Sequence, residues 1–185
     1  MKNKQVLIDL DGVVVNWTKA AMGLCGIDAN EPAVVETLLR EYDAIDALVG
    51  WKTLADHING AGVDYWVNLE FLPWGQQLVQ LAINKVGKEN VAFCTSPGRF
   101  PHAPTGKFLW REKNYRDLDI VITKSKHLLA RPGTLLIDDD FRQIEKFHSN
   151  GGSTYMWPNQ YILRKSGVDG ALTEVGIQME KLGKE

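Results

Sequence analysis

The sequence predicts an α/β fold built on a parallel sheet, with a block of helices inserted after the first strand. Three observations predict it: short runs of consecutive apolar residues, helical stretches between these runs, and a segment at 18–68 that contains helical patterns only. An apolar run without alternation is typical of a strand that is buried on both faces, as in a parallel sheet. Strands that alternate with helices favour right-handed crossovers and helices packed against the sheet.

The core elements follow from this pattern in chain order. Five strands are expected at the apolar runs 6–8, 91–94, 119–123, 134–137 and 153–157, the last after the Gly151-Gly152 turn signal. Helices are expected between them at 75–86, 105–113 and 141–149. In the first of these, Leu78, Leu81 and Ala82 recur at the spacing of one helix face.

The segment between the first and second strands does not alternate in this way. Its clearest helices are expected at 31–42 and 51–60, and Gly50, Gly60 and Gly62 are expected to break them. We therefore predict a core of residues 1–17 and 69–185 and a small helical cap at 18–68.

Composition restricts the class of protein. With 185 residues, 44% hydrophobic and 24% charged, the chain can bury one core, and disorder is not expected. No apolar run approaches the ~18 residues of a membrane span, and the chain start lacks the apolar stretch of a cleavable leader, so a cytoplasmic protein is expected. Two cysteines, Cys25 and Cys94, make neither a disulfide framework nor a zinc site.

Charge and tryptophan are unevenly distributed. The net charge is -2, which argues against a coat on nucleic acid, yet residues 99–131 hold eight Lys/Arg against three Asp/Glu. This local excess is expected to form a basic mouth for a small anion. Four of the six tryptophans lie in the first 74 residues, in or beside the expected cap, where a nucleobase would need a flat surface.

Polar residues follow each of the first four predicted strands. They are Asp9 and Asp11, then Thr95 and Ser96, then Lys124 and Lys126, then Asp138, Asp139 and Asp140. In open parallel sheets, ligands bind beyond the carboxyl ends of the strands. Carboxylates crowded there repel one another unless a hard cation holds them, and a set of oxygen ligands favours Mg²⁺ over zinc. Hydroxyls and a lysine beside that cation suit a phosphoryl group.

Each of these features alone has a simpler explanation. An isolated Asp-x-Asp is commonly a turn or a helix cap, Thr-Ser-Pro is commonly an N-cap, and a lone lysine is commonly solvated. The run at 138–140 suits a calcium-like loop or the first turn of a helix. The four together, in this order and each after a buried strand, favour a single site for phosphoryl transfer.

These residues also resemble a known family. Asp9-Leu10-Asp11-Gly12-Val13, Thr95-Ser96, Lys126 and Asp138-Asp139 resemble the four motifs of the haloacid dehalogenase (HAD) superfamily of phosphatases. The segments at 93–97, 104–110, 120–126 and 135–139 are similar in order and spacing to the 5'(3')-deoxyribonucleotidases, as is 69–74. The resemblance covers residues 4–17 and 69–145. It implies a HAD-like, Rossmannoid three-layer α/β/α sandwich with a small helical cap.

The resemblance implies roles for the strand-end residues. Asp9 is the expected nucleophile, which would form an aspartyl-phosphate. Asp11 would protonate the leaving alcohol and then activate the hydrolytic water. Thr95 and Ser96 would donate hydrogen bonds to phosphoryl oxygens, and Lys126 would offset charge on the pentacoordinate state and on Asp9.

The resemblance also implies a Mg²⁺ site. Its expected protein ligands are Asp9, the main-chain carbonyl of Asp11, and Asp139. Asp138 is expected to orient Lys126 or a metal-bound water, although the triple run leaves the choice between Asp138 and Asp139 open.

Further residues match positions around the expected substrate. Lys107 and Lys124 match family positions that contact phosphate from a greater distance; the alternative is that both are solvated. Trp17 matches an aromatic residue at the cap hinge that stacks on the base, and the alternative is packing beneath the cap. Weaker candidates are Tyr65 and Trp66 for the base, and Arg99 and His102 for the phosphate entrance.

Two departures from the family pattern make the nucleotide preference less certain than the chemistry. Asn16 replaces an acidic residue, and Thr-Lys-Ser-Lys at 123–126 lacks an arginine that would grip phosphate in two places. The leading hypothesis is a Mg²⁺-dependent phosphomonoesterase acting on (deoxy)nucleoside 5'(3')-monophosphates.

Other functions stay open at this point. A HAD phosphatase could act on a sugar phosphate, another small phosphate or a nucleic-acid end. A receiver-type phosphoacceptor domain and a catalytically silent binding protein are further alternatives. The expected partner is a small-molecule phosphate, with no nucleic-acid polymer and no membrane, and a homodimer is among the assemblies open to the chain.

Overall fold

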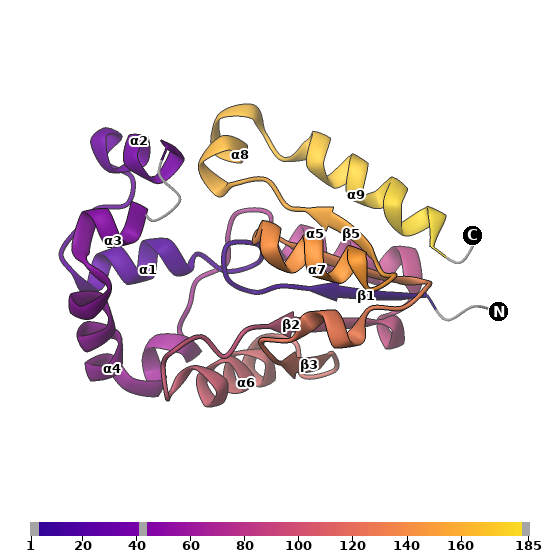
Figure 1. Ribbon diagram of the computed structural model, residues 1–185, viewed down its shortest axis with the longest axis horizontal. Coiled ribbons are helices and arrows are strands. Elements are labelled where there is room, and N and C mark those ends of the chain that lie inside the picture. Colours follow the sequence, from indigo (N-terminus) through magenta and orange to yellow (C-terminus); the bar gives the residue numbers. More distant parts are fainter. Residues whose placement is uncertain (1–3, 41–43, 183–185) are drawn as a thin grey trace.

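A computed structural model describes residues 4–40 and 44–182 and shows a five-stranded parallel sheet between layers of helices (Figure 1). The strands are β1 (Gln5–Ile8), β2 (Val91–Thr95), β3 (Asp119–Ile122), β4 (Thr134–Asp138) and β5 (Ser153–Met156). All neighbouring strands pair in parallel. The predicted α/β fold is confirmed, and each predicted strand differs from the observed one by a single residue at one end.

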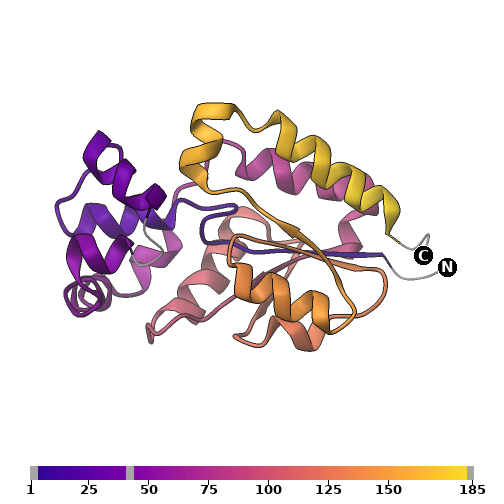
Figure 2. The same ribbon diagram turned by 45° about the horizontal axis from the view of Figure 1, so that its top comes forward.

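Helices cover both faces of the sheet. Val6 and Ile8 of β1 face the larger apolar cluster, to which α5 (Gly75–Val86), α6 (Ala103–Asn114) and α9 (Asp169–Lys181) contribute. Leu7 faces a smaller cluster on the other side, closed by α7 (Phe141–Ser149) and by the short helix η2 (Lys126–Leu129). Figure 2 shows α9 lying along α5. The expected helices at 75–86 and 141–149 match these bounds, whereas α6 begins two residues earlier than predicted.

The order of the strands is β3-β2-β1-β4-β5. From the central strand β1, the chain therefore fills one side of the sheet with β2 and β3 and the other side with β4 and β5. The carboxyl end of β1 is thus the point where the strand order reverses, the usual position of a ligand site in such sheets. A receiver-type domain has the order 2-1-3-4-5. The sheet therefore excludes the receiver-type alternative.

Four helices follow β1 and lie together beyond the carboxyl ends of the strands (Figure 1). They are α1 (Trp17–Leu24), α2 (Pro32–Arg40), α3 (Ala44–Val49) and α4 (Trp51–Val67), which we call the insertion. The helix predicted at 31–42 corresponds to α2, which begins one residue later than predicted. The predicted end at 41–42 lies outside the described residues. The predicted helix at 51–60 continues to Val67, because Gly62 kinks it (φ 68°, ψ -150°) without ending it.

The insertion leaves and re-enters the core through two segments that pair with each other. The backbone N–H of Asn16 donates to the carbonyl of Glu70 at 2.8 Å. Beside it, Val15 and Phe71 form an antiparallel bridge. The two connections between insertion and core therefore lie next to each other at the end of β1.

The chain after β5 forms two helices that were not predicted, α8 (Gln160–Ser166) and α9. Arg164 of α8 donates a hydrogen bond to Asn30 of the insertion, so the C-terminal segment contacts both parts of the molecule. A short helix η1 (Lys88–Asn90) precedes β2. Over 4–40 and 44–182, no helix has the length and apolar character required to cross a bilayer.

Candidate active site

Asp9 and Asp138 lie side by side because they end neighbouring parallel strands. The N–H of Asp9 donates to the carbonyl of Ile137 at 2.9 Å, so the pairing of β1 with β4 continues to the site. Lys126, the first residue of η2, reaches both carboxylates: its Nζ donates to Asp9 Oδ1 and to Asp138 Oδ2, each at 2.6 Å. All three side chains are buried, with Lys126 only 2% exposed.

One ammonium group thus serves two buried carboxylates. Burial alone would lower the pKa of Lys126, but the charges of Asp9 and Asp138 raise it above its ordinary value. Burial and the neighbouring charge of Asp9 raise the pKa of Asp138 to about 7, although Lys126 opposes this. Lys126 is therefore charged, and its single positive charge is shared between two carboxyl groups.

Asp139 brings a third carboxylate to the same place. Asp9, Asp138 and Asp139 offer oxygens that all lie within 4.8 Å of one another and could hold a metal ion. Asp139 is exposed as a whole residue, but desolvation of its carboxyl group within the cluster, together with Asp9 and Asp138, raises its pKa well above the usual range. An all-oxygen set with excess negative charge fits a hard cation such as Mg²⁺.

Gly12 gives the Asp139 carboxylate its room. Its backbone is in the left-handed region (φ 78°), and a Cβ at this position would stand 2.1 Å from Asp139 Oδ2. Only glycine meets both conditions without strain or displacement. The turn after β1 therefore requires glycine for the position of the Asp139 carboxylate as well as for its own shape.

Asp11 is held by a lysine from another part of the core. Lys107 of α6 is buried, and its Nζ donates to Asp11 Oδ2, to Thr95 Oγ1 at 3.0 Å and to the carbonyl of Ser96 at 2.7 Å. The solvated alternative is therefore wrong for Lys107. Desolvation raises the pKa of Asp11, although Lys107 opposes the shift. Lys124 is exposed and makes no hydrogen bond or ion pair with other described residues.

A pocket of about 340 Å³ opens at these strand ends. It brings together seven of the ten predicted site residues: Asp9, Asp11, Trp17, Ser96, Lys126, Asp138 and Asp139. The other three, Thr95, Lys107 and Lys124, do not line it. Of these, the Thr95 hydroxyl is fully buried and accepts from Lys107, so it lies behind the pocket wall.

The tryptophans of the N-terminal segment have different roles. Trp17, half-buried at the start of α1, lines the pocket. Trp66 and Trp74 are buried in the core, where the indole N–H of Trp74 donates to the carbonyl of Val13 at 3.0 Å. Trp51 is 41% exposed and outside the pocket. The clustering of tryptophan therefore reflects packing near the hinge more than a surface for a base.

The weaker candidates lie elsewhere. Tyr65 is half-buried, and its hydroxyl donates to the carbonyl of Trp17 at 3.4 Å, so it supports the backbone of that residue. Arg99 and His102 are exposed and do not line the pocket.

Three lining residues have no counterpart in the sequence prediction: Thr18, Ile45 and Gln143. Asp140, which also lines the pocket, belongs to the predicted acidic run but was given no role of its own. Gln143 lies in the first turn of α7, directly after the acidic run, so continuing the pattern from the strand end into the helix would have found it. Ile45 had no such signal, because nothing in the sequence shows which helix of the insertion faces the sheet.

The positive charges of 99–131 that lie at the site are not free to form the expected basic mouth. Lys107 and Lys126 are buried against carboxylates, and Arg111 pairs with Glu112. The positive charges of 99–131 that reach the site therefore balance the site's own acids. A phosphate would meet a net negative pocket unless a cation were bound.

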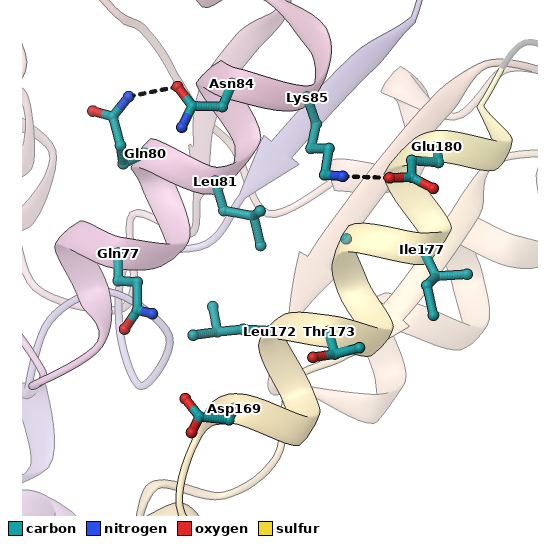
Figure 3. Close-up of a pocket in the computed structure, with 11 residues that line it drawn as sticks. Gln77, Gln80, Leu81, Asn84, Lys85, Asp169, Leu172, Thr173, Ile177 and Glu180 are labelled. Carbon is teal, nitrogen blue, oxygen red and sulfur yellow. Dashed lines mark hydrogen bonds and ion pairs between the residues drawn. The ribbon is translucent and has the colours of Figure 1, made fainter.

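A larger hollow of about 730 Å³ lies between α5 and α9 (Figure 3). Across it, Lys85 pairs with Glu180, and Gln80 donates to Asn84 along α5. Its lining contains no group of carboxylates that could hold a metal, and it lies away from the strand ends. The smaller pocket is therefore the candidate active site.

Comparisons with known proteins agree with the fold. No protein-family model and no curated protein matches the chain. Among solved structures, a hydrolase from Streptococcus pneumoniae TIGR4 is similar at 15% identity, with a TM-score of 0.53, over 90% of this chain and 98% of that one. A HAD-family hydrolase from Deinococcus radiodurans R1, solved with bound phosphate and sodium, matches at 11% identity and a TM-score of 0.51, over 97% of each chain.

A third similar structure is a phosphonoacetaldehyde hydrolase-like protein from Oleispira antarctica, at 13% identity and a TM-score of 0.50, over 98% of this chain and 95% of that one. At these identities the likeness establishes the fold, which is that of HAD-family hydrolases. Chemistry and substrate must be argued from the site itself.

Proposed function

We propose that this protein is a Mg²⁺-dependent phosphomonoesterase that hydrolyses (deoxy)nucleoside monophosphates through an aspartyl-phosphate. The observation that carries the proposal is the convergence of Asp9, Asp11, Lys126 and a three-carboxylate cluster on one pocket at the switch point of the sheet. Such a set supplies a nucleophile, a proton donor, a fixed positive charge and a cation site.

Asp9, Asp139 and the main-chain carbonyl of Asp11 would hold the Mg²⁺. When bound, the ion offsets the negative charge of the carboxylates and of the phosphoryl group, so that the two can approach. Asp138 then acts through Lys126. It accepts a hydrogen bond from the Lys126 ammonium at 2.6 Å and keeps that group directed at Asp9.

The residues of the chain carry the chemical steps. A carboxylate oxygen of Asp9 bonds to phosphorus while the ester bond breaks, and the leaving oxygen keeps the electron pair and takes a proton from Asp11. In the second step, a water molecule gives a proton to Asp11 while the water oxygen bonds to phosphorus. The bond between phosphorus and the Asp9 oxygen then breaks. Ser96 donates a hydrogen bond to a phosphoryl oxygen in this scheme, which its position in the pocket lining supports.

The insertion supports a nucleoside as the leaving group. Trp17 and Ile45 offer an aromatic and an aliphatic surface to the same pocket. A volume of about 340 Å³ suits one small monoester. We include in the proposal that the substrate is a free small molecule of the cytoplasm, and that residues 18–68 act as a cap that selects it.

A substrate panel tests the function. Phosphate release is measured for deoxy- and ribonucleoside 5'- and 3'-monophosphates, sugar phosphates and a 5'-phosphorylated oligonucleotide, each with Mg²⁺ or with EDTA. We expect Mg²⁺-dependent release from nucleoside monophosphates, abolished in Asp9→Asn and retained in Asp56→Asn, a matched change at an exposed position of α4. If phosphate release from a sugar phosphate were stronger, the proposed substrate would be a sugar phosphate in place of a nucleotide. An active Asp9→Asn variant would overturn the mechanism.

A further inference from the structure

The hydrogen bonds of Lys107 leave it nothing to offer a substrate. A lysine ammonium has three donors. Lys107 Nζ has three acceptors: Asp11 Oδ2, Thr95 Oγ1 at 3.0 Å and the carbonyl oxygen of Ser96 at 2.7 Å. The residue is 2% exposed and does not line the pocket. Lys107 is therefore poorly suited to bind phosphate, the role that its sequence position implies.

The insertion covers the side of this ammonium group that its acceptors leave open. The ring of Trp66, from the last turn of α4, lies with its centroid 5.3 Å from Lys107 Nζ. The contact depends on Gly106, because a Cβ there would stand 2.2 Å from Trp66 Cβ. α4 thus encloses Lys107 on α6, and the carboxylate of Asp11 is the only one that pairs with its ammonium group among the described residues.

Asp11 in turn depends on Lys107. The hydrogen bond from Lys107 is the only one that its carboxyl group receives from the described residues, and it occupies Oδ2 alone. The other oxygen, Oδ1, is shielded from solvent and has no hydrogen-bond partner within 4–40 and 44–182. One oxygen of Asp11 is therefore anchored by Lys107, and the other is left without a hydrogen bond.

We propose that Lys107 is a positioning residue that fixes the carboxyl group of Asp11 for proton transfer, and that it does not bind the substrate. The inference rests on the proposed function. While Lys107 holds Oδ2, Oδ1 gives its proton to the leaving oxygen as the ester bond breaks, and it later takes a proton from the water that attacks phosphorus. Because Trp66 belongs to the insertion and contacts Lys107, the position of Lys107 depends on how the insertion packs on the core.

Two esters with different leaving groups can distinguish a positioning role of Lys107 from a role in binding phosphate. A nucleoside leaves only when its oxygen is protonated, whereas p-nitrophenolate leaves without a proton. Loss of Lys107 should therefore slow the reaction of a nucleoside monophosphate by ~10²-fold or more, the usual contribution of a general acid. The first turnover of p-nitrophenyl phosphate should remain fast and appear as a burst of p-nitrophenol, followed by slow hydrolysis of the aspartyl-phosphate.

The variants are Lys107→Met, Asp11→Asn and the double variant, with Lys113→Met as the matched control on the exposed end of α6. Circular dichroism and thermal unfolding establish that each is folded. If Lys107→Met does not fold, Lys107→Gln, which keeps donors for Thr95 and Ser96, replaces it. We expect the double variant to be no slower than Asp11→Asn, because residues that act through one group are not additive.

Three results would overturn the inference: an equal loss of the first-turnover rate for both esters, a raised KM with unchanged kcat, or a double variant slower by the product of the single losses. Each would show that Lys107 acts on the phosphate. A wild-type chain that releases phosphate from neither ester would overturn the proposed function, and with it any role of Lys107 in the reaction. That result does not depend on the variants, so the two failures are distinct.

Discussion

Replacing Gly12 by alanine tests whether Asp139 lies where a cation needs it. The new methyl group would stand 2.1 Å from Asp139 Oδ2, whereas ordinary contacts begin near 3.4 Å. The carboxylate is the free end of a short side chain, so it must withdraw by more than 1 Å. The three-carboxylate cluster, whose oxygens now lie within 4.8 Å of one another, would then lose one member.

Two effects of this change can be separated in magnitude. The left-handed backbone at Gly12 (φ 78°) costs a residue with a Cβ about 1–2 kcal/mol. For a chain of this size each kcal/mol lowers Tm by roughly 2–4 °C. Displacement of a site group by 1 Å reduces activity by about 10²-fold. Gly12→Ala should therefore be modestly less stable and almost inactive.

Gly151→Ala is the matched control, because Gly151 has a similar backbone (φ 87°) with no atom within 4 Å of its missing Cβ. Thermal unfolding is recorded in EDTA and over a Mg²⁺ series, together with phosphate release. Both variants should lose similar stability in EDTA, but only Gly12→Ala should lose the rise of Tm with Mg²⁺ and the activity. A Gly12→Ala protein with wild-type Mg²⁺ response and turnover would refute the placement of the metal beside Asp139.

Three further predictions concern the carboxylates and the helices. In EDTA, Tm should fall as the pH rises from about 5 to about 8. The reason is that the pKa of Asp138 is about 7 in the folded protein against an ordinary 3.8. The contribution of protonated Asp138 to stability is complete below pH 3.8 and is lost as the pH rises through about 7. A Tm that rises over this range would contradict that sign. Lys126→Met should lower the free energy of unfolding by about 3–5 kcal/mol in urea at neutral pH, because it leaves two buried carboxylates unpaired; a loss below ~1 kcal/mol would show that the pair is not buried as described. Gly106→Ala should destabilise the protein by about 1–3 kcal/mol, because the new methyl group collides with Trp66. The control Gly170→Ala in α9, with open space around it, should stabilise the protein by about 0.5–1 kcal/mol. Equal changes in the free energy of unfolding would refute the close packing of α4 on α6.

The strands could be predicted because burial on both faces leaves a plain record in the sequence. Val6, Leu7 and Ile8 are all buried, since two different clusters receive them, so no polar residue interrupts the run. The polar residue that ends each run then marks the sheet edge. Asp9 and Asp138 could therefore be placed together before any coordinates were known.

Lys107 shows what such reasoning misses. The sequence left phosphate contact and solvation as the two roles for this lysine, and only the fold shows that α6 points it at Asp11 across the site. The charge excess of 99–131 misled for the same reason, because a count of charges does not show which of them are paired. Ile45 was missed because the way the insertion packs on the core depends on contacts between distant segments.

The pairing of Asn16 with Glu70 has a consequence for how this chain could change over evolutionary time. Seen from the core, everything between these residues is one long loop whose ends already meet. Because the closure entropy of a loop grows only slowly with length, by about 0.6 kcal/mol per doubling, helices can be gained or lost there with little effect on the folding of the sheet. The pocket residues at the strand ends and the helices of the insertion can therefore diversify at different rates. The contact of Trp66 with Lys107 is the point where a replacement segment would have to be fitted to the old core.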